Sequence, residues 1–230
     1  MERHLDEEIR NLHKGILKMG ASVEDIISKA IESIKMRNQE FSKSIIDSDD
    51  EIDTAEVKLE EECIRLLALY QPVAEDLRYI IAVTKIVNDL ERMADIAVNI
   101  TECSIEMANE PLLKPLIDIP KMAELAKSML KNALNSFISR DLSLAKMIWI
   151  QEEEADRLRD LVFEELIGFI EKDGKCVNKA LPLLLIARHL ERICDLCTNI
   201  SEDVVYIITG KTIKHQSDII RKLNNNKTVN

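Results

Sequence analysis

The sequence is poor in glycine, proline and aromatic residues. Its 230 residues include five Gly and five Pro, and Phe, Trp and Tyr together make up 3%. Sheet proteins need turn residues at short intervals and are enriched in aromatic and β-branched side chains, so this composition argues against a sheet protein. The abundance of Leu, Ile, Ala, Glu and Lys instead favours long helices that pack through aliphatic side chains.

The chain also lacks a long apolar run and an excess of positive charge. No stretch approaches the roughly twenty apolar residues that a membrane span requires, and residues 1–8 contain no apolar core typical of a signal peptide. The net charge of -11 makes nucleic acid a poor choice of partner. We therefore expect a cytoplasmic protein that has no transmembrane segment and binds no nucleic acid.

The cysteine pattern fits reduced thiols in a cytosol, because the five cysteines are odd in number. Cys194 and Cys197 form a CxxC pair, which is often a sign of zinc binding or redox chemistry. Here the pair interrupts a helical apolar pattern, and no second CxxC completes a set of four ligands. We therefore prefer the interpretation that both are buried small hydrophobic residues.

Apolar residues recur at helical spacing along almost the whole chain. The pattern predicts six long helices, over about residues 5–38, 41–70, 73–107, 121–139, 142–171 and 177–208. Pro111, Pro115 and Pro120 interrupt it and mark a linker. We predict an all-α fold of two tandem, sequence-related three-helix bundles packed side by side, with bundles at 1–108 and 121–209, a linker at 109–120 and a polar C-terminal tail at 210–230.

The two halves are related in sequence. Residues 90–102 align without a gap to residues 190–202 and are identical at seven of thirteen positions, where chance gives roughly one. The chain therefore contains an internal duplication. Each unit is too small to bury much surface alone, so the two should pack along each other.

Acidic residues lie four positions apart in both copies of this repeat, and so share one helix face. The preceding helix of each half carries a matching acidic pair. A trailing Asn extends each acidic stripe, at Asn99 and Asn199. The eight carboxylates are Asp49, Asp53, Glu91 and Asp95 in the first half and Glu152, Asp156, Glu191 and Asp195 in the second.

The position of each helix turn places these acids at matching heights. Asp53 and Glu91 each lie nineteen residues from Pro72, and Asp49 and Asp95 each lie twenty-three from it. The acids of the second half likewise lie in pairs at equal separations from a turn at 173–174. Equal separations from a turn mean equal heights in an antiparallel helix pair. Each bundle is therefore expected to present four carboxylates at one level.

Crowded carboxylates must protonate, separate into solvent or bind cations. Oxygen ligands without imidazole or thiolate favour hard cations such as Mg, Ca, Mn or ferric iron. The Glu-x-x-His pattern of di-iron bundles does not occur here. The alternative is a solvated acidic face on which Arg92 or Arg192 forms ordinary ion pairs. The duplication, and the equal separations of the paired acids from each turn, favour a cation site over a solvated face.

Two segments resemble the repeated signature of the PhoU family: residues 90–95 followed by Asn99-Ile100, and residues 190–195 followed by Asn199-Ile200. Residues 71–78, Gln-Pro-Val-Ala-Glu-Asp-Leu-Arg, resemble the family's inter-helix turn. The similarity covers roughly residues 1–210. The chain departs from the family at Ala94 and Cys194, where the family usually has Gly.

The resemblance implies two similar three-helix bundles, often assembled as a homodimer. It also implies a negative regulator of phosphate uptake and phosphate signalling, which links a phosphate ABC transporter to a sensor histidine kinase at the inner face of the membrane. Some relatives bind multinuclear metal clusters through E(D)xxxD motifs. Carried over to this chain, the eight carboxylates become metal ligands, with Asn99 and Asn199 as additional candidates, for an iron cluster or for Mn, Mg, Ca or Zn.

We expect a regulatory, metal-binding adaptor and no enzyme, because the sequence has no nucleophile–base pair, Gly-rich phosphate loop or metalloprotease motif. Two alternatives remain open. One is a carboxylate-bridged multi-metal enzyme, such as a phosphohydrolase. The other is a purely structural helical protein whose acids form surface ion pairs.

Overall fold

The computed structural model describes residues 4–108 and 111–213, and these ranges contain helices and no strand. This confirms the predicted all-α fold. The helices are α1 (His4–Met36), α2 (Gln39–Asp47), α3 (Asp50–Tyr70), α4 (Ala74–Met107), α5 (Asp118–Ser139), α6 (Leu142–Lys172), the short 3-10 helix η1 (Gly174–Cys176) and α7 (Val177–Thr209).

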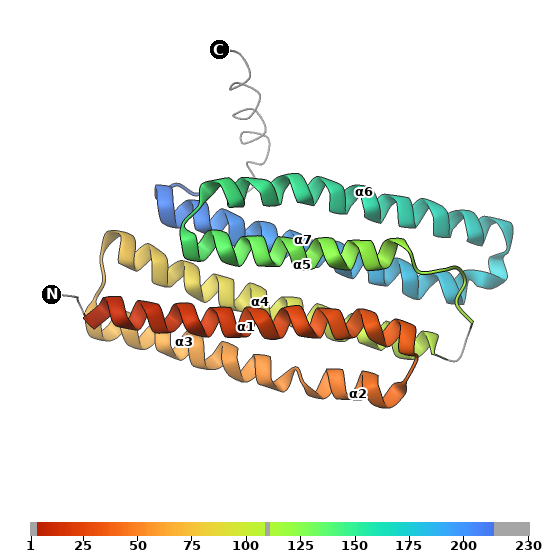
Figure 1. Ribbon diagram of the computed structural model, residues 1–230, viewed down its shortest axis with the longest axis horizontal. Coiled ribbons are helices and arrows are strands. Elements are labelled where there is room, and N and C mark those ends of the chain that lie inside the picture. Colours follow the sequence, from red (N-terminus) through yellow and green to blue (C-terminus); the bar gives the residue numbers. More distant parts are fainter. Residues whose placement is uncertain (1–3, 109–110, 214–230) are drawn as a thin grey trace, which may run out of the picture.

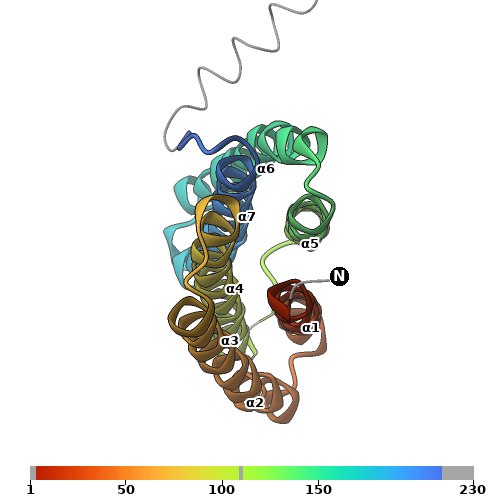
Figure 2. The same cartoon turned by 90° about the vertical axis from the view of Figure 1, so that its left-hand side faces the viewer.

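The helices form two three-helix bundles that lie side by side (Figure 1). The first contains α1, the α2–α3 pair and α4, and the second contains α5, α6 and α7. Seen end-on, α3, α4, α7 and α6 form one curved layer, and α1 and α5 cover one side of it (Figure 2). The bundles meet where α4 packs along α7 and where α1 packs along α5, in both cases antiparallel.

The core follows from the apolar spacing of each helix. Buried side chains of α1, such as Leu12, Ile16 and Val23, recur every three or four residues, as expected for a helix with one face against a core. The central helices α4 and α7 are buried along most of their length, because each packs against its own bundle and against the other. No helix in the described ranges has the length and hydropathy of a membrane span.

The predicted second helix is wrong in one respect: it is broken at Ser48 and Asp49 into α2 and α3. The Ser48 hydroxyl donates to the Ile45 carbonyl at 2.7 Å, and the Asp49 amide donates to the Ile46 carbonyl at 3.2 Å. Ser and Asp favour such local bonds over the regular helix ladder. The break makes Asp49 the N-cap residue of α3.

The remaining boundaries lie within a few residues of the prediction. Pro72 ends α3, and Gln71 before it adopts a left-handed conformation with φ 45°. The helix α5 begins at Asp118, earlier than predicted, because Pro120 is tolerated in a first helical turn. The predicted tail begins at Gly210, and its residues 214–230 lie outside the described ranges, as do residues 109–110 of the predicted linker.

Side chains at two places join the bundles. Lys85 of α4 pairs with the buried Asp203 of α7 at 2.9 Å. Toward the start of α4, Tyr79 stacks on Phe137 of α5 with ring centroids 5.3 Å apart, and His13 of α1 meets both rings edge-on. The bundles are thus held by polar and aromatic contacts as well as by the aliphatic core.

Gly20 permits the close approach of α1 to α5. A Cβ atom at this position would clash with a methyl carbon of Leu134, which is itself buried.

Gly168 in α6 has open space around it. Because Ala gains helix propensity over Gly at both sites, we expect Gly168→Ala to raise the free energy of unfolding by about 0.5–1 kcal/mol. Gly20→Ala should be less stable than Gly168→Ala by roughly 1–2 kcal/mol in urea unfolding, since overpacking a core is costly. Equal stabilities would contradict a tight α1–α5 contact.

Candidate functional site

The acids of the first bundle meet between the start of α3 and the middle of α4. Asp49 is the N-cap residue of α3 and Asp53 lies in its first turn, while Glu91 and Asp95 lie one turn apart on α4. Both Asp53 and Asp95 raise the pKa of Asp49, and Asp53 and Asp49 both raise the pKa of Glu91. The structure therefore brings these four acids within electrostatic reach of one another.

The pKa values of two of these acids are displaced strongly. Loss of solvation, followed by the charges of Asp53, Asp95 and Asp50, raises the pKa of Asp49 to about 6. Loss of solvation, followed by Asp95, Glu56, Asp53 and Asp49, raises the pKa of Glu91 to about 7. Every charge that acts on these two acids is negative, so within the described part of the chain no cation relieves the repulsion on Asp49 and Glu91.

Glu56 belongs to the same cluster, although the sequence analysis did not single it out. It lies three residues after Asp53 on α3, and its Oε1 accepts a hydrogen bond from Asn88 Nδ2 at 3.3 Å. Its own pKa is raised by loss of solvation and by neighbouring acids that include Asp53 and Asp95. The sequence could have indicated Glu56, because residues three positions apart are neighbours on one helix face.

The acids of the second bundle have a different environment, because two arginines reach them. Arg159 Nη1 lies 2.8 Å from Asp156 Oδ1 and 2.5 Å from Glu191 Oε1. Arg188 Nη1 lies 2.7 Å from the same Glu191 oxygen. Glu191 is buried, with 5% of its surface exposed, and its Oε2 has no hydrogen-bond partner among the described residues.

The other two acids of the second bundle lie near this pair. Loss of solvation, with Glu191 and Asp156, raises the pKa of Asp195 to about 6, and the cations of Arg188 and Arg159 act against that rise. After loss of solvation, the charges of all four predicted acids, Glu152 among them, raise the pKa of the Cys194 thiol. All four therefore lie within electrostatic reach of Cys194, with two guanidinium groups among them.

Arg92 forms an ordinary ion pair with Asp89 at 3.4 Å, and this acid is not one of the eight predicted ligands. Loss of solvation, followed by the charge of Arg192, lowers the pKa of His189. The arginines that contact predicted ligands, Arg159 and Arg188, were missed by the sequence analysis. They could have been found from their spacing of three residues from Asp156 and Glu191.

The two asparagines lie in different surroundings. The Asn99 amide donates to the backbone carbonyl of Asp95 at 2.9 Å. Asn199 lines a polar groove of about 360 Å³ between α4 and α7, with Lys85 and Arg92.

A cation fits the donor set of the first cluster. Asp49 Oδ1 is buried and accepts no hydrogen bond from any described residue, and such a buried oxygen is costly unless something satisfies it. Across the described residues, no three His, Cys, Asp or Glu side chains already form a metal-holding group. Ligation would therefore require these acids to rotate toward the ion.

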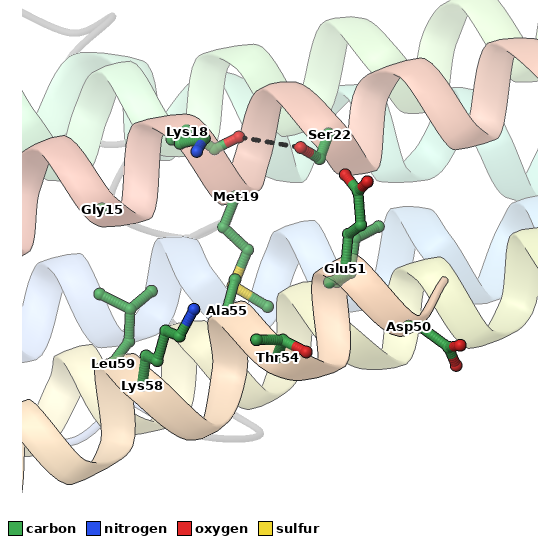
Figure 3. A pocket seen from close by; sticks show the side chains of 11 residues that line it. Gly15, Lys18, Met19, Ser22, Asp50, Glu51, Thr54, Ala55, Lys58 and Leu59 are labelled. Carbon is green, nitrogen blue, oxygen red and sulfur yellow. Dashed lines mark hydrogen bonds between the residues drawn. The ribbon is translucent and has the colours of Figure 1, made fainter. Parts of the chain in front are cut away.

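A groove of about 550 Å³ lies on another side of α3, between α3 and α1 (Figure 3). The residues that line it include the apolar Met19 and Leu59 and the basic Lys18 and Lys58. Figure 3 shows Glu51 extending from α3 toward α1. The groove is formed by residues other than the predicted ligands, so it is a separate feature.

The CxxC cysteines are buried, at 1% and 0% exposure for Cys194 and Cys197. Burial raises the pKa of both thiols far above the ordinary value, and raises that of Cys63 to about 12 and that of Cys103 to about 11. This confirms that they are buried hydrophobic residues, and it opposes thiolate chemistry.

A thiol reagent should therefore distinguish Cys176, the one cysteine that is not buried. We expect Ellman's reagent at pH 8 to modify this thiol in the native protein within minutes, and all five after denaturation. The Cys176→Ser variant provides the control, because its native form should then be unreactive. Rapid modification of Cys194 or Cys197 in folded protein would contradict their burial.

Comparison with known proteins places most of the chain in one family. The PhoU domain model matches residues 16–104 and again residues 119–204. The chain is 40% identical over 212 residues to the phosphate-specific transport system accessory protein PhoU homolog of Aquifex aeolicus, covering 92% of this chain and 96% of that protein. It is 34% identical over 209 residues to the homolog from Clostridium acetobutylicum, covering 90% and 95%.

A solved structure has the same fold. The crystal structure of PhoU from Pseudomonas aeruginosa matches with a TM-score of 0.86 and 29% identity, covering 90% of this chain and 100% of that one. The two domain matches agree with the internal duplication read from the sequence.

Proposed function

Because this chain belongs to the PhoU family, we propose that it is an accessory protein of phosphate-specific transport. The observation that supports this most strongly is similarity over nearly the full length of relatives that carry this name. The two carboxylate-bearing hairpins lie within the matched residues. The relatives are named as accessory proteins, which fits a role without catalysis.

In more detail, the protein acts as a negative regulator of phosphate uptake and phosphate signalling. It works in the cytoplasm as a homodimer and docks on a phosphate ABC transporter and a sensor histidine kinase at the inner face of the membrane. Exposed apolar side chains near the helix turns, such as Leu69, Val73 and Leu181, offer contact surface for such partners.

The first carboxylate cluster binds a hard cation and couples metal occupancy to the shape of the α3–α4 hairpin. Asp49, Asp53, Glu91 and Asp95 supply the oxygens, and Glu56 is within reach. Two observations support this. Asp49 Oδ1 is buried without a hydrogen-bond partner among the described residues, and the charges that act on Asp49 and Glu91 are all negative. Iron and manganese are the first ions to test, because both accept carboxylate ligands.

Deletion of the gene tests the regulatory role. We expect cells without it to express phosphate-starvation genes in high phosphate, because the signal that reports sufficiency is lost. A reporter fused to such a promoter should rise several-fold, and the wild-type gene should restore repression. The Gly168→Ala allele serves as a folded, neutral control. Unchanged reporter output in the deletion strain would contradict the proposal.

The carboxylate cluster also favours a second candidate, a multi-metal phosphohydrolase. Purified protein loaded with Mn²⁺ separates the two functions. We expect no hydrolysis of p-nitrophenyl phosphate above a metal-only blank. Metal-dependent turnover that Glu91→Gln abolishes would favour the enzyme.

A further inference from the structure

We propose that the two bundles are chemically unequal, with Arg159 and Arg188 in the second taking the place of a cation, so that its carboxylates need no metal. This rests in part on the proposed function, since it limits the cation site to the first bundle. The eight acids repeat between the halves, so from the acids alone each half would be expected to bind metal. The side chains that neighbour those acids differ between the two halves.

The contacts in the second bundle satisfy the acids that a metal would need. Arg159 bridges α6 and α7, since one guanidinium nitrogen reaches both Asp156 and Glu191, at 2.8 and 2.5 Å. Arg188 adds a second cation to Glu191 at 2.7 Å. Charge-assisted bonds of this length are the strong kind. Two positive charges thus already lie where an incoming cation would have to bind.

The first bundle carries different residues at the matching positions. Asp53 and Asp156 are equivalent in the two hairpins, and three residues later stand Glu56 and Arg159. Glu91 and Glu191 are equivalent, and three residues earlier stand Asn88 and Arg188. Glu56 and Asn88 hydrogen-bond to each other at 3.3 Å. An acid and an amide thus replace two arginines, and the sign of the local charge changes.

Burial adds to the difference. Glu191 is buried at 5% exposure, whereas Glu91 remains partly accessible. A cation entering the second cluster would have to displace both guanidinium groups from one oxygen. The other oxygen, Glu191 Oε2, lacks a partner among the described residues as Asp49 Oδ1 does, so the two guanidinium groups are what distinguishes the second cluster.

The backbone differs as well. The helix that carries Glu152 and Asp156 runs unbroken from Leu142 to Lys172, while α3 begins anew beside Asp49. Asp49 and Asp53 of the first bundle therefore lie next to a helix break, where Asp49 is the N-cap residue. In the second bundle the corresponding helix is continuous, and its acids are held by arginines.

Exchanging these residues between the bundles tests the inference in the full chain. Mn²⁺ is the probe, measured by equilibrium dialysis with elemental mass spectrometry, and circular dichroism checks that each variant is folded. The variant Arg159→Glu/Arg188→Asn gives the second bundle the residues of the first. We expect it to bind Mn²⁺ in addition to the wild-type complement. Glu56→Arg/Asn88→Arg makes the reverse change and should weaken Mn²⁺ binding roughly 10- to 100-fold.

A third variant needs no inserted charge. Glu191→Gln/Asp195→Asn should leave the Mn²⁺ stoichiometry of the wild type unchanged and its affinity within about twofold. Loss of part of the bound Mn²⁺ in this variant would overturn the inference, as would a folded Arg159→Glu/Arg188→Asn protein that gains none. In a further outcome, the wild type binds no Mn²⁺ while the Arg159→Glu/Arg188→Asn variant does bind it. That result would contradict the proposed metal site of the first bundle and would support the role of the arginines.

Discussion

Replacing Arg159 by Met is expected to lower the free energy of unfolding at pH 7.5 by about 2–4 kcal/mol. The substitution keeps most of the aliphatic stem and removes the cation that contacts Asp156 and Glu191. Glu191 would then remain buried, with the cation of Arg188 still in contact with it. A buried carboxylate that loses part of its neutralisation is destabilising, because its charge is poorly solvated.

Urea unfolding followed by circular dichroism measures this effect, and Arg157→Met is the matched control. Arg157 lies two residues away on the same helix and pairs with Glu154 on the surface. Surface pairs contribute little, so the control should remain close to wild type. The double variant Arg159→Met/Glu191→Met should recover much of the loss, since both charges are then gone. Equal effects of the two arginine substitutions would refute a special role for Arg159.

The first cluster should respond in the opposite direction. We expect Asp49→Asn/Glu91→Gln to stabilise the metal-free protein by roughly 1–2 kcal/mol at pH 7.5, because it removes two charges from a repelling group that solvent screens only in part. The same variant should lose cation binding by at least about 100-fold, because two of the oxygen ligands become neutral amides. A gain in stability together with a loss of binding is the signature of a functional site.

The pH dependence follows from the raised pKa values. The pKa values of Asp49 and Glu91 in the folded protein are about 6 and about 7, above their ordinary values of 3.8 and 4.5. The folded state therefore holds protons more tightly than the unfolded state, and this contribution to stability is present at low pH. It is lost as the pH rises from about 4 through 7.

Thermal unfolding in the presence of a chelator tests this sign. The stability of the double variant minus that of wild type should be near zero at pH 4 and increase up to pH 7.5. Half-buried His13 and His189, whose pKa values are lowered, affect both proteins equally and cancel in the difference. Glu154→Gln provides a control, because that acid lies outside the cluster and pairs with Arg157. A difference that shrinks as the pH rises would contradict the assignment.

Much of the fold could be predicted from the sequence, because helical spacing and strong turn signals dominate it. Pro72 and the Asp173–Gly174 turn located both hairpins, and from them followed the matching heights of the acids. The break at Ser48 was missed, since an apolar pattern continues through it. A tight turn of two polar residues changes the helix without interrupting that pattern.

The difference between the two sites could not be predicted from the acids alone. Both hairpins carry acids at the same spacing. What separates them is Arg159 of α6, which reaches across to Glu191 of α7, and Arg188, which contacts Glu191 from the same helix. Such contacts depend on rotamers and on the crossing of two helices, which spacing does not determine. Alignment of residues 49–56 with residues 152–159 would have placed Glu56 at the position of Arg159. It would not have shown that the Arg159 guanidinium reaches Glu191.

The packing of α4 along α7, and of α1 along α5, also has a consequence for how the chain folds during synthesis. Each of these partners is separated from the other by about a hundred residues of sequence. At 5–20 residues per second, the first bundle emerges from the ribosome roughly 5–20 s before the helices that will cover it. For that time the apolar side of α4 has no partner. The nascent chain is then expected to depend on chaperones, and translation pauses after Met107 would lengthen this exposure.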